Sequence, residues 1–354
     1  LDFRAEAAKL RDHVLNNLDY YVNQFAENAE KAGSKVHFAF DDKEATQIAL
    51  DILRQREAKM IVKSKTILTE EIGLNEVLEE AGIETEVYLA SEYRYKKNFL
   101  DKDSLVIFVS QSGETADTLA CLKKIKETDA KSLGIINVEK SSISLLVDEV
   151  IYTKSGSEIA VATTKAYTSQ LAVFSLLTLS SLVKNRKLDK IDAVITELKN
   201  IGNDVQTLLK DTSKYQEVAK KIVASKKIFF LGRSIDYAIM KEGDLKLKEI
   251  TYISSECYAA GELKHGPISL IDKDTLVIAG NTNKLLYEKT ESNLCEVTAR
   301  GANTLLITNK NTDSDNILIP ERSIYVSPIL EVIPLQLIAY YTGVLLERDI
   351  DKPR

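Results

Sequence analysis

Short apolar runs occur twice in this chain of 354 residues with nearly the same spacing, and this repeat limits the possible folds more than any other feature. The matched runs begin at Ser104 and Thr275, at Ser132 and Thr304, and at Lys59 and Lys227. In all three pairs the second run follows the first by roughly 170 residues, and offsets that agree this closely indicate a duplicated domain of that length.

Each apolar run is separated from the next by a segment with helical periodicity. This alternation is typical of α/β domains, in which helices cover both faces of a parallel sheet. The sequence therefore predicts two doubly wound, flavodoxin-like parallel sheets, each in a three-layer α/β/α sandwich. The predicted strands are Met60–Val62, Thr85–Leu89, Leu105–Val109, Ser132–Ile136 and Glu149–Tyr152 in the first half, and Lys227–Leu231, Thr275–Ala279, Thr304–Thr308 and Ser323–Val326 in the second.

Four segments follow from this pattern. They are a helical leader (1–58), a first domain (59–183), a polar helical linker (184–214) and a second domain (215–354). The leader has no counterpart in the second half, and it contains a candidate extra strand at Val36–Phe40. The apolar run Leu171–Val183 is too short to span a bilayer, so we predict a core helix there.

Charge and cysteine content exclude several classes of protein. The net charge of −6 leaves no electrostatic footprint for nucleic acid. The three cysteines, Cys121, Cys257 and Cys295, lie far apart and lack the spacing of a metal site. A small, odd number of cysteines fits free thiols in a reducing compartment. We expect a soluble cytoplasmic protein without a metal, a cofactor, a nucleic-acid partner or a membrane.

A cluster of polar residues follows the strand predicted at Leu105–Val109 and opens a helix. It reads Ser110-Gln111-Ser112-Gly113-Glu114-Thr115. Hydroxyls and free backbone N–H groups at a helix N-terminus form a cradle for an anion, and ligands of open α/β sheets bind beyond the carboxyl ends of the strands. A simple helix cap is the alternative. Because capping needs fewer polar residues than this turn holds, we predict a phosphate site.

Two further turns occupy comparable places. The turn that matches the cradle in the second half, Gly280-Asn281-Thr282-Asn283-Lys284, has fewer hydroxyls. We interpret it as structural and expect one phosphate site rather than two. The pair Thr163-Thr164 precedes a helix after the strand near Ile151. A helix cap and a ligand contact are both open for this pair.

A carboxylate and a histidine stand out in the second half. Glu242, Lys246 and Glu249 share one face of a predicted helix that starts directly after a strand, and His265 follows that helix in a Gly-Pro turn. A glutamate and a histidine in one site are the usual means of moving protons between carbon and oxygen. We predict Glu249 and His265 as catalytic, with Glu242 and Lys246 in support. A surface ion-pair stripe and a structural histidine are the alternatives.

Five longer segments carry specific motifs. They are LASEYRY at 89, SQSGETADT at 110, EIAVATTKAYT at 158, EGDLKLKEITYISSECYAAGELKHGP at 242 and VIPLQLIAYY at 332. Together they resemble the isomerase domain of glucosamine-6-phosphate synthases, which is a pair of sugar-isomerase (SIS) subdomains. The resemblance runs from about Val87 to Arg354.

That resemblance implies a reaction and a set of site residues. The family converts fructose 6-phosphate into glucosamine 6-phosphate with ammonia from a separate glutaminase domain. The sugar phosphate would be held by Ser110, Gln111, Ser112 and Thr115, and the sugar would be lined by Val161 and Thr163. Glu249 would move the proton between C1 and C2, and His265 of a neighbouring subunit would open the ring. A homodimer is therefore expected.

Three features depart from that family. No glutaminase domain and no N-terminal nucleophilic cysteine is expected, so glutamine would not be the nitrogen donor. The family continues past the Asp351-Lys352-Pro353-Arg354 region with a tail that carries the carbonyl-attacking lysine, and we do not expect that lysine in this chain. The family's first strand ends in a Cys-Gly-Thr-Ser turn, whereas Val62-Lys63-Ser64-Lys65-Thr66 takes that place here. We expect Lys63 and Lys65 to replace some of the lost phosphate contacts.

Residues 2–86 resemble a different family. The segments DHVLNNLDYY at 12 and IVKSKTILTEEIGLNEVLEEAGIE at 61 are similar to the start of LutB-type lactate-utilisation proteins. Those proteins carry iron–sulfur clusters whose cysteine sets are missing here, so that function is not expected. The two resemblances meet near Glu84–Val87, within one strand-loop-helix-strand unit, whereas natural fusions more often join whole domains at a linker. We interpret the chain as an engineered chimera in which 59–86 is grafted onto the first domain.

These expectations combine into one interpretation and two alternatives. The first is an SIS-type scaffold that binds ligands of the fructose 6-phosphate or glucosamine 6-phosphate kind with little or no synthase activity. The second is a residual fructose-6-phosphate/glucose-6-phosphate isomerase, because that reaction needs proton transfer but no Schiff base. The third is a structural recombination of folds without any ligand. Whether the chain is an enzyme stays open at this point.

Overall fold

The computed structural model describes most of the chain after residue 60. The described residues are 60–65, 84–97, 100–184, 189–312 and 315–353, together with Asn17, Tyr20, Gln24, Glu27, Glu30 and Lys31. The predicted leader strand Val36–Phe40 lies outside these residues. The side chains of Lys63 and Lys65 also lie outside them.

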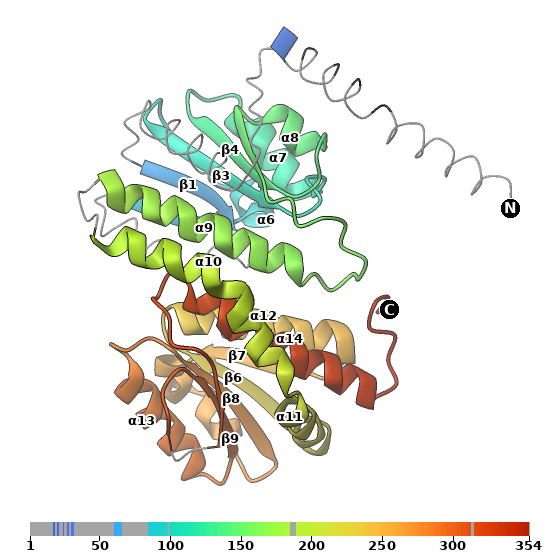
Figure 1. Cartoon of the computed structure of the whole chain (residues 1–354), viewed down its shortest axis with the longest axis vertical. Helices are drawn as coiled ribbons and strands as arrows, with labels where there is room; N and C mark the ends of the chain where they lie inside the picture. Colours follow the sequence, from blue (N-terminus) through green and yellow to red (C-terminus); the bar gives the residue numbers. More distant parts are fainter. Residues whose placement is uncertain are drawn as a thin grey trace, which may run out of the picture.

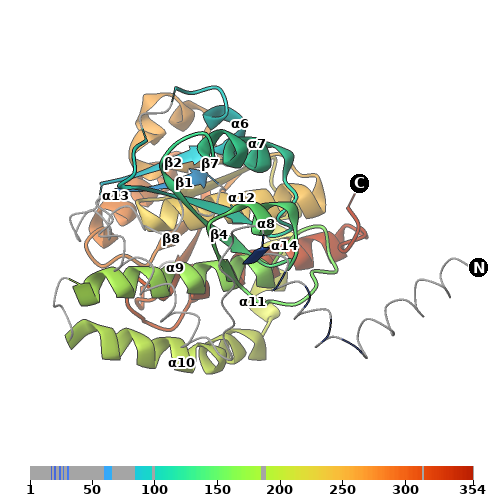
Figure 2. The same cartoon turned by 90° about the horizontal axis from the view of Figure 1, so that it is seen from above.

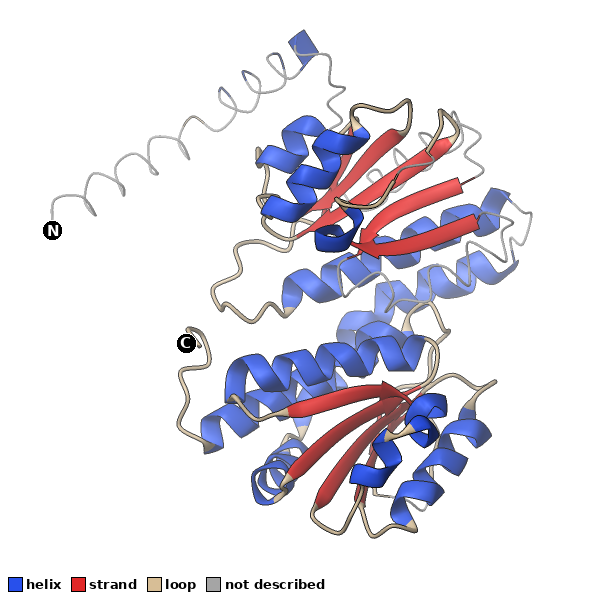
Figure 3. Cartoon of the chain, turned by 180° about the vertical axis from the view of Figure 1, so that it is seen from behind, coloured by secondary structure: helices blue, strands red, loops and turns tan. Residues whose placement is uncertain are grey.

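Two five-stranded parallel sheets form the body of the described chain (Figure 3). The first has the order β2 (Glu84–Leu89), β1 (Met60–Lys65), β3 (Ser104–Ser110), β4 (Lys131–Ile136) and β5 (Glu149–Tyr152). The second has the order β7 (Ser255–Ala259), β6 (Lys227–Gly232), β8 (Thr275–Asn281), β9 (Asn303–Thr308) and β10 (Asn316–Leu318). Both sheets therefore have the strand order 2-1-3-4-5 of flavodoxin-like folds. The predicted duplication of a doubly wound sheet is confirmed.

The central strands β3 and β8 show why continuous apolar runs marked them in the sequence. All seven residues of each strand are buried, because helices cover both faces of each sheet. Strand order also requires a crossover on each side of β1 and of β6. The strand order thus reverses between β1 and β3 in the first sheet and between β6 and β8 in the second. The carboxyl ends of these strands form the topological switch points, where ligands of such folds bind.

Three strands of the second half differ between the sequence prediction and the structure. β7 and β10 were not predicted, because β7 carries polar residues at Ser255 and Glu256 and β10 has only three residues. The predicted strand Ser323–Val326 is wrong, since these residues turn into a helix instead. Ser323 donates its backbone N–H and its hydroxyl to Glu197, and the N–H of Val326 returns to the carbonyl of Ser323. Those bonds replace the ladder bonds of a strand.

Helices surround the two sheets (Figures 1 and 2). Those of the first half are α6 (Ala90–Tyr93), α7 (Ala116–Ile125), α8 (Ser142–Leu146) and α9 (Lys165–Lys184), and α10 (Asp189–Lys210) follows. Those of the second half are α11 (Ser213–Ala224), α12 (Ile235–Thr251), α13 (Tyr287–Thr298) and α14 (Ser327–Leu345), with 3₁₀ turns η1 (Ala260–His265) and η2 (Pro267–Leu270). The predicted linker is thus mainly α10, which contacts α9 and α14 rather than crossing solvent.

Helix α14 is long and apolar. By length and hydropathy it alone among the described helices could cross a membrane, yet 61% of its apolar 18-residue stretch is buried inside the protein. It packs against α10, α11 and α12, and Leu330, Val332 and Leu335 belong to the largest hydrophobic cluster. The same cluster includes Tyr167 and Leu171 of α9, which supports the predicted core helix at Leu171–Val183. These contacts join the first half of the chain to the second.

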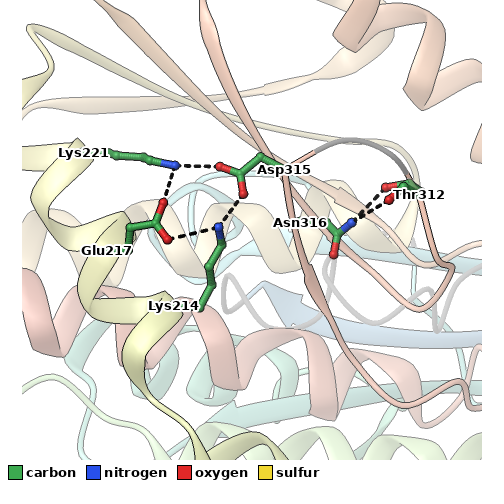
Figure 4. Close-up of polar contacts among 6 residues, drawn as sticks. All are labelled: Lys214, Glu217, Lys221, Thr312, Asp315 and Asn316. Carbon is green, nitrogen blue, oxygen red and sulfur yellow. Dashed lines mark hydrogen bonds and ion pairs between the residues drawn. The ribbon is translucent and has the colours of Figure 1, made fainter.

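An ion-pair network fastens α11 to the segment before β10 (Figure 4). Lys214 lies 2.5 Å and Lys221 lies 2.7 Å from Asp315, and both lysines also pair with Glu217. Although burial alone would raise the pKa of Asp315, the hydrogen bonds from the two lysines hold it below its ordinary value. Partly exposed pairs of this kind each contribute well under about 1 kcal/mol, so the network orients the edge strand more than it stabilises the domain.

Candidate functional site

The predicted anion cradle is a preorganised turn between β3 and α7. Its centre is the buried hydroxyl of Ser110, which accepts the backbone N–H of Gly113 at 3.0 Å and lies 3.2 Å from the hydroxyl of Thr115. Ser112 accepts the N–H of Glu114 at 3.2 Å. The structure therefore brings the predicted cradle residues together at the first switch point. Thr115 precedes α7, so the N-terminus of that helix also faces the turn.

Gly113 fixes the shape of this turn. Its φ of +67° lies in the left-handed region that favours glycine. A Cβ at this position would lie 1.9 Å from Oγ of Ser141, which is buried. The Glu114 carboxylate accepts the backbone N–H of Ser142 at 2.7 Å, and hydrogen bonds from the side chain and the backbone of Ser142 lower the pKa of Glu114. The cradle is thereby held between α7 and α8.

Asn137, which the sequence analysis did not single out, ties the cradle to the loop after β5. Its backbone N–H donates to the carbonyl of Gln111. Its side-chain oxygen accepts bonds from Thr153 and Ser155, and its amide donates to the carbonyl of Gly156 at 2.8 Å. The sequence signal for this role was an asparagine directly after a predicted strand. Its hydrogen-bond partners follow the next strand, β5, so the sequence alone did not connect them with it.

The loop that contains Val161 and Thr163 reaches the second domain. Ala162 is buried in a small cluster with Ile250 of α12, Ala339 of α14 and the half-buried Ile350. The N–H of Val161 donates to the carbonyl of Asp351 at 3.0 Å, and the Val161 side chain is 66% exposed. Because Ile250 follows Glu249 on α12, these contacts bring the predicted sugar-lining loop to the end of α12 that carries the predicted catalytic carboxylate.

Three charged side chains form a chain along α12, as predicted. Lys246 Nζ lies 2.6 Å from Glu249 Oε2 and 3.4 Å from Glu242 Oε1. Glu242 and Lys246 are almost fully buried, whereas the Glu249 side chain is 36% exposed. Burial raises the pKa of Glu242 to about 7 despite the neighbouring lysine. Burial would lower the pKa of Lys246, but the two carboxylates more than offset it and raise that pKa. The surface-stripe alternative does not describe this buried arrangement.

His265 stands apart from this group. It ends the 3₁₀ turn η1, and the following Gly266 has a φ of +139°. Its side chain is 74% exposed, and its Nε2 lies 3.9 Å from Oε2 of Glu262. In the described part of the chain no hydrogen bond or ion pair connects His265 with Glu249. A single copy of the chain therefore does not bring the predicted catalytic pair together.

The comparisons with known proteins fit this architecture. The SIS-domain profile matches residues 77–180 and 221–346, which is more than half of the chain. The chain belongs to the SIS-domain family. Each of the two matched stretches contains one cluster of the predicted site residues: the cradle in the first SIS domain, and the Glu242–Glu249 helix in the second.

Relatives in sequence and in structure agree on the double SIS fold. Glutamine–fructose-6-phosphate aminotransferase (isomerizing) of Clostridium tetani is 45% identical over 291 residues, which cover 80% of this chain and 48% of that protein. The chain thus spans about half the length of the curated relatives it matches. The C-terminal domain of glucosamine-fructose-6-phosphate aminotransferase from Francisella tularensis superposes with a TM-score of 0.80 at 36% identity, covering 90% of this chain and 91% of that domain.

Two other matches are weaker in what they show. Tagatose-6-phosphate ketose/aldose isomerase from Escherichia coli has a TM-score of 0.72 at 17% identity, covering 88% of this chain and 89% of that one, which shows a shared fold only. The LUD-domain profile matches residues 22–116. It overlaps the SIS match over 77–116, so β2 and β3 lie in both matches and β1 lies in the LUD match alone.

Proposed function

We propose that this SIS protein binds a phosphorylated sugar of the fructose 6-phosphate or glucosamine 6-phosphate kind. The observation that carries the proposal is the cradle, where Ser110 organises the turn from a buried position at the switch point. Its backbone N–H groups and hydroxyls suit a phosphate. The relatives support the choice of sugar, since their names include fructose 6-phosphate.

We propose Glu249 as the base that moves a proton between C1 and C2 of the bound sugar. It is the partly exposed end of a buried charge chain, so a ligand can reach it while Lys246 holds its carboxylate in place. The buried loop residue Ala162 places Val161 and Thr163 beside the same end of α12. Aldose–ketose isomerisation needs only this proton transfer and ring opening. We therefore propose it as the activity to test in addition to sugar-phosphate binding.

Removing the Ser110 hydroxyl should weaken phosphosugar binding. S110A takes away the acceptor that holds the N–H of Gly113 and a group that can contact the phosphate. A hydrogen bond to a charged group is worth about 1.5–3 kcal/mol, so we expect about a 10- to 100-fold loss of affinity. Isothermal titration with fructose 6-phosphate measures this effect. S292A, an exposed serine on α13, is the matched control.

The titration also separates binding of the phosphate from binding of the sugar. Unphosphorylated fructose should give no heat with the wild-type chain at millimolar concentration. Equal affinity for fructose and fructose 6-phosphate would contradict a phosphate cradle. No heat and no thermal shift with either sugar would favour the ligand-free alternative.

We further propose that His265 acts in the site of a second copy of the chain. Its exposed position and its separation from Glu249 support a shared site. Mixing inactive H265A with inactive E249Q should then restore isomerisation. Random exchange in a two-fold dimer regenerates about one quarter of the wild-type sites. Light scattering on the same samples should show a dimer, and a monomer with full activity would contradict the shared site.

The two separate profile matches support a mixed origin for the chain. We infer that the leader and the body descend from different parents that join inside the first sheet. We propose that this join is engineered and that it reduces synthase activity; a turnover assay with fructose 6-phosphate and ammonia tests the reduced activity.

A further inference from the structure

The second switch point contains a buried carboxylate of the protein itself. Asp236 lies in the first turn of α12 and is 0% exposed. Its carboxylate accepts the Thr282 hydroxyl at 2.5 Å, the Thr282 N–H at 3.0 Å and the Asn283 N–H at 3.4 Å. Thr282 and Asn283 follow β8, in the turn that corresponds to the cradle after β3. An internal anion therefore occupies the place of a second bound phosphate.

A second carboxyl group approaches the same place from α14. Glu331 is 0% exposed, and neither of its oxygens meets a hydrogen-bond donor among the described residues. A Cβ on Gly280 would lie 2.1 Å from Glu331 Oε1 and 3.2 Å from Asp236 Cβ. Both carboxyl side chains thus pack against the same glycine of β8. There is room for both carboxyl side chains because Gly280 has no Cβ.

Two adjacent carboxylates cannot both remain ionised in a dry core. Three hydrogen bonds from Thr282 and Asn283 stabilise the charge of Asp236, whereas for Glu331 only the Thr282 hydroxyl, which is already donated to Asp236, opposes the rise of the pKa. Burial raises the pKa of Glu331 well above its ordinary value, and the charge of Asp236 raises it further. Burial also raises the pKa of Asp236, against the bonds from Thr282 and Asn283. Tyr287 on α13 is the other titratable group near Asp236, and no basic side chain of the described residues acts on either carboxyl.

We propose that Glu331 keeps a proton that it shares with the Asp236 carboxylate, and that this acid pair is a positioning clasp for α12. The proton of Glu331 forms the hydrogen bond that Asp236 can still accept. The clasp fastens the first turn of α12 to β8 and to α14 at one point. It also explains why this half of the chain has no free anion cradle.

The clasp lies on the helix that carries Glu242, Lys246 and Glu249. It therefore fixes the start of the element on which the proposed proton transfer depends. The shared proton itself does not depend on the proposed sugar-phosphate function. Its test consequently uses stability and infrared measurements, which can fail or succeed independently of sugar binding.

The pH dependence of unfolding gives the first test. Glu331 keeps its proton in the folded state and releases it on unfolding above about pH 5, because an unfolded glutamate has a pKa of about 4.3. The contribution of the clasp is thus complete at low pH and is lost as the pH rises toward the folded-state pKa. One released proton raises the unfolding equilibrium constant about tenfold per pH unit. E331Q keeps the size of the side chain and a hydrogen-bond donor but has no proton to release. The slope of the logarithm of its unfolding constant against pH should therefore be lower than the wild-type slope by about one.

Two comparisons make the result specific. E288Q changes an exposed carboxylate on α13 and should retain the wild-type slope. Glu242 contributes equally to the pH slope of unfolding in the wild type and in E331Q. The difference between the two slopes therefore reports Glu331 alone. Identical slopes for E331Q and the wild type would overturn the proposal.

Infrared spectroscopy tests the proton directly and does not require E331Q to fold. Among the described residues Glu242 is the other glutamate with a raised pKa, so the E242Q chain should show the carbonyl band of a protonated, slowly exchanging carboxyl group at pH 7. A spectrum of E242Q without that band would overturn the shared proton. Where E331Q folds, the band should be absent from an E242Q/E331Q double variant, and its persistence there would also overturn the assignment.

Discussion

Replacing Gly232 with alanine is expected to destabilise the second domain by about 3 kcal/mol, the upper end of the usual cost of overpacking. Gly232 ends β6, and α12 begins three residues later and passes directly over it. A Cβ on Gly232 would lie 2.4 Å from the backbone nitrogen of Tyr237 and 2.5 Å from the carbonyl carbon of Asp236. These are backbone atoms, so no rotamer change relieves the clash. Chemical denaturation of G232A and the wild type measures the loss.

Gly202 provides the matched control for this substitution. It lies exposed in the middle of α10, and a Cβ there would meet nothing within 4 Å. G202A should therefore stabilise the protein by about 0.5–1 kcal/mol, because alanine loses less backbone freedom in a helix than glycine does. Equal effects of G202A and G232A would show that the close approach of α12 to β6 is not the cause.

Replacing Glu249 with glutamine is expected to slow proton transfer on a bound sugar phosphate by several orders of magnitude. Loss of a general base typically lowers the rate by about 10²- to 10⁴-fold. The phosphate cradle lies in the other SIS domain, so the affinity for fructose 6-phosphate should change little. The amide should also keep a contact with Lys246, which leaves the buried charge chain near its place.

Solvent-hydrogen exchange is the sharpest measurement for this variant. The wild-type chain should incorporate deuterium at C2 or C1 of the sugar in heavy water, detected by NMR, even if net isomerisation is slow. E249Q should not, while E288Q should exchange at the wild-type rate. Exchange at the wild-type rate in E249Q would rule out Glu249 as the base. Loss of both exchange and binding would instead indicate a collapsed site.

The fold could be predicted from the sequence because its central strands are buried on both faces. Continuous apolar residues in β3, β4, β8 and β9 gave both their positions and the repeat. The strand β7 could not be found this way, because its side chains are only partly covered and include polar groups. Pairing with β6 makes it a strand, and that contact is not visible in local sequence.

The site was predictable where its residues are close in sequence. The cradle and the Glu242–Glu249 stripe each lie within one turn or one helix. Contacts over long sequence separations were not predictable, such as Asn137 with the loop after β5 or Asp236 with Glu331. The second of these depends on Gly280 leaving space between three elements. A lone acidic residue in an apolar helix, as at Glu331, was the only local hint.

The position of β1 has a consequence for where this protein could be divided. β1 pairs with both β2 and β3, so it is an inner strand and not an edge. Yet it lies outside the stretch that the SIS profile matches, which begins at residue 77. A fragment cut at that boundary would leave β2 detached and expose a bare flank of β3 to other chains. The first sheet therefore starts earlier than the family boundary, inside the segment that the LUD profile matches.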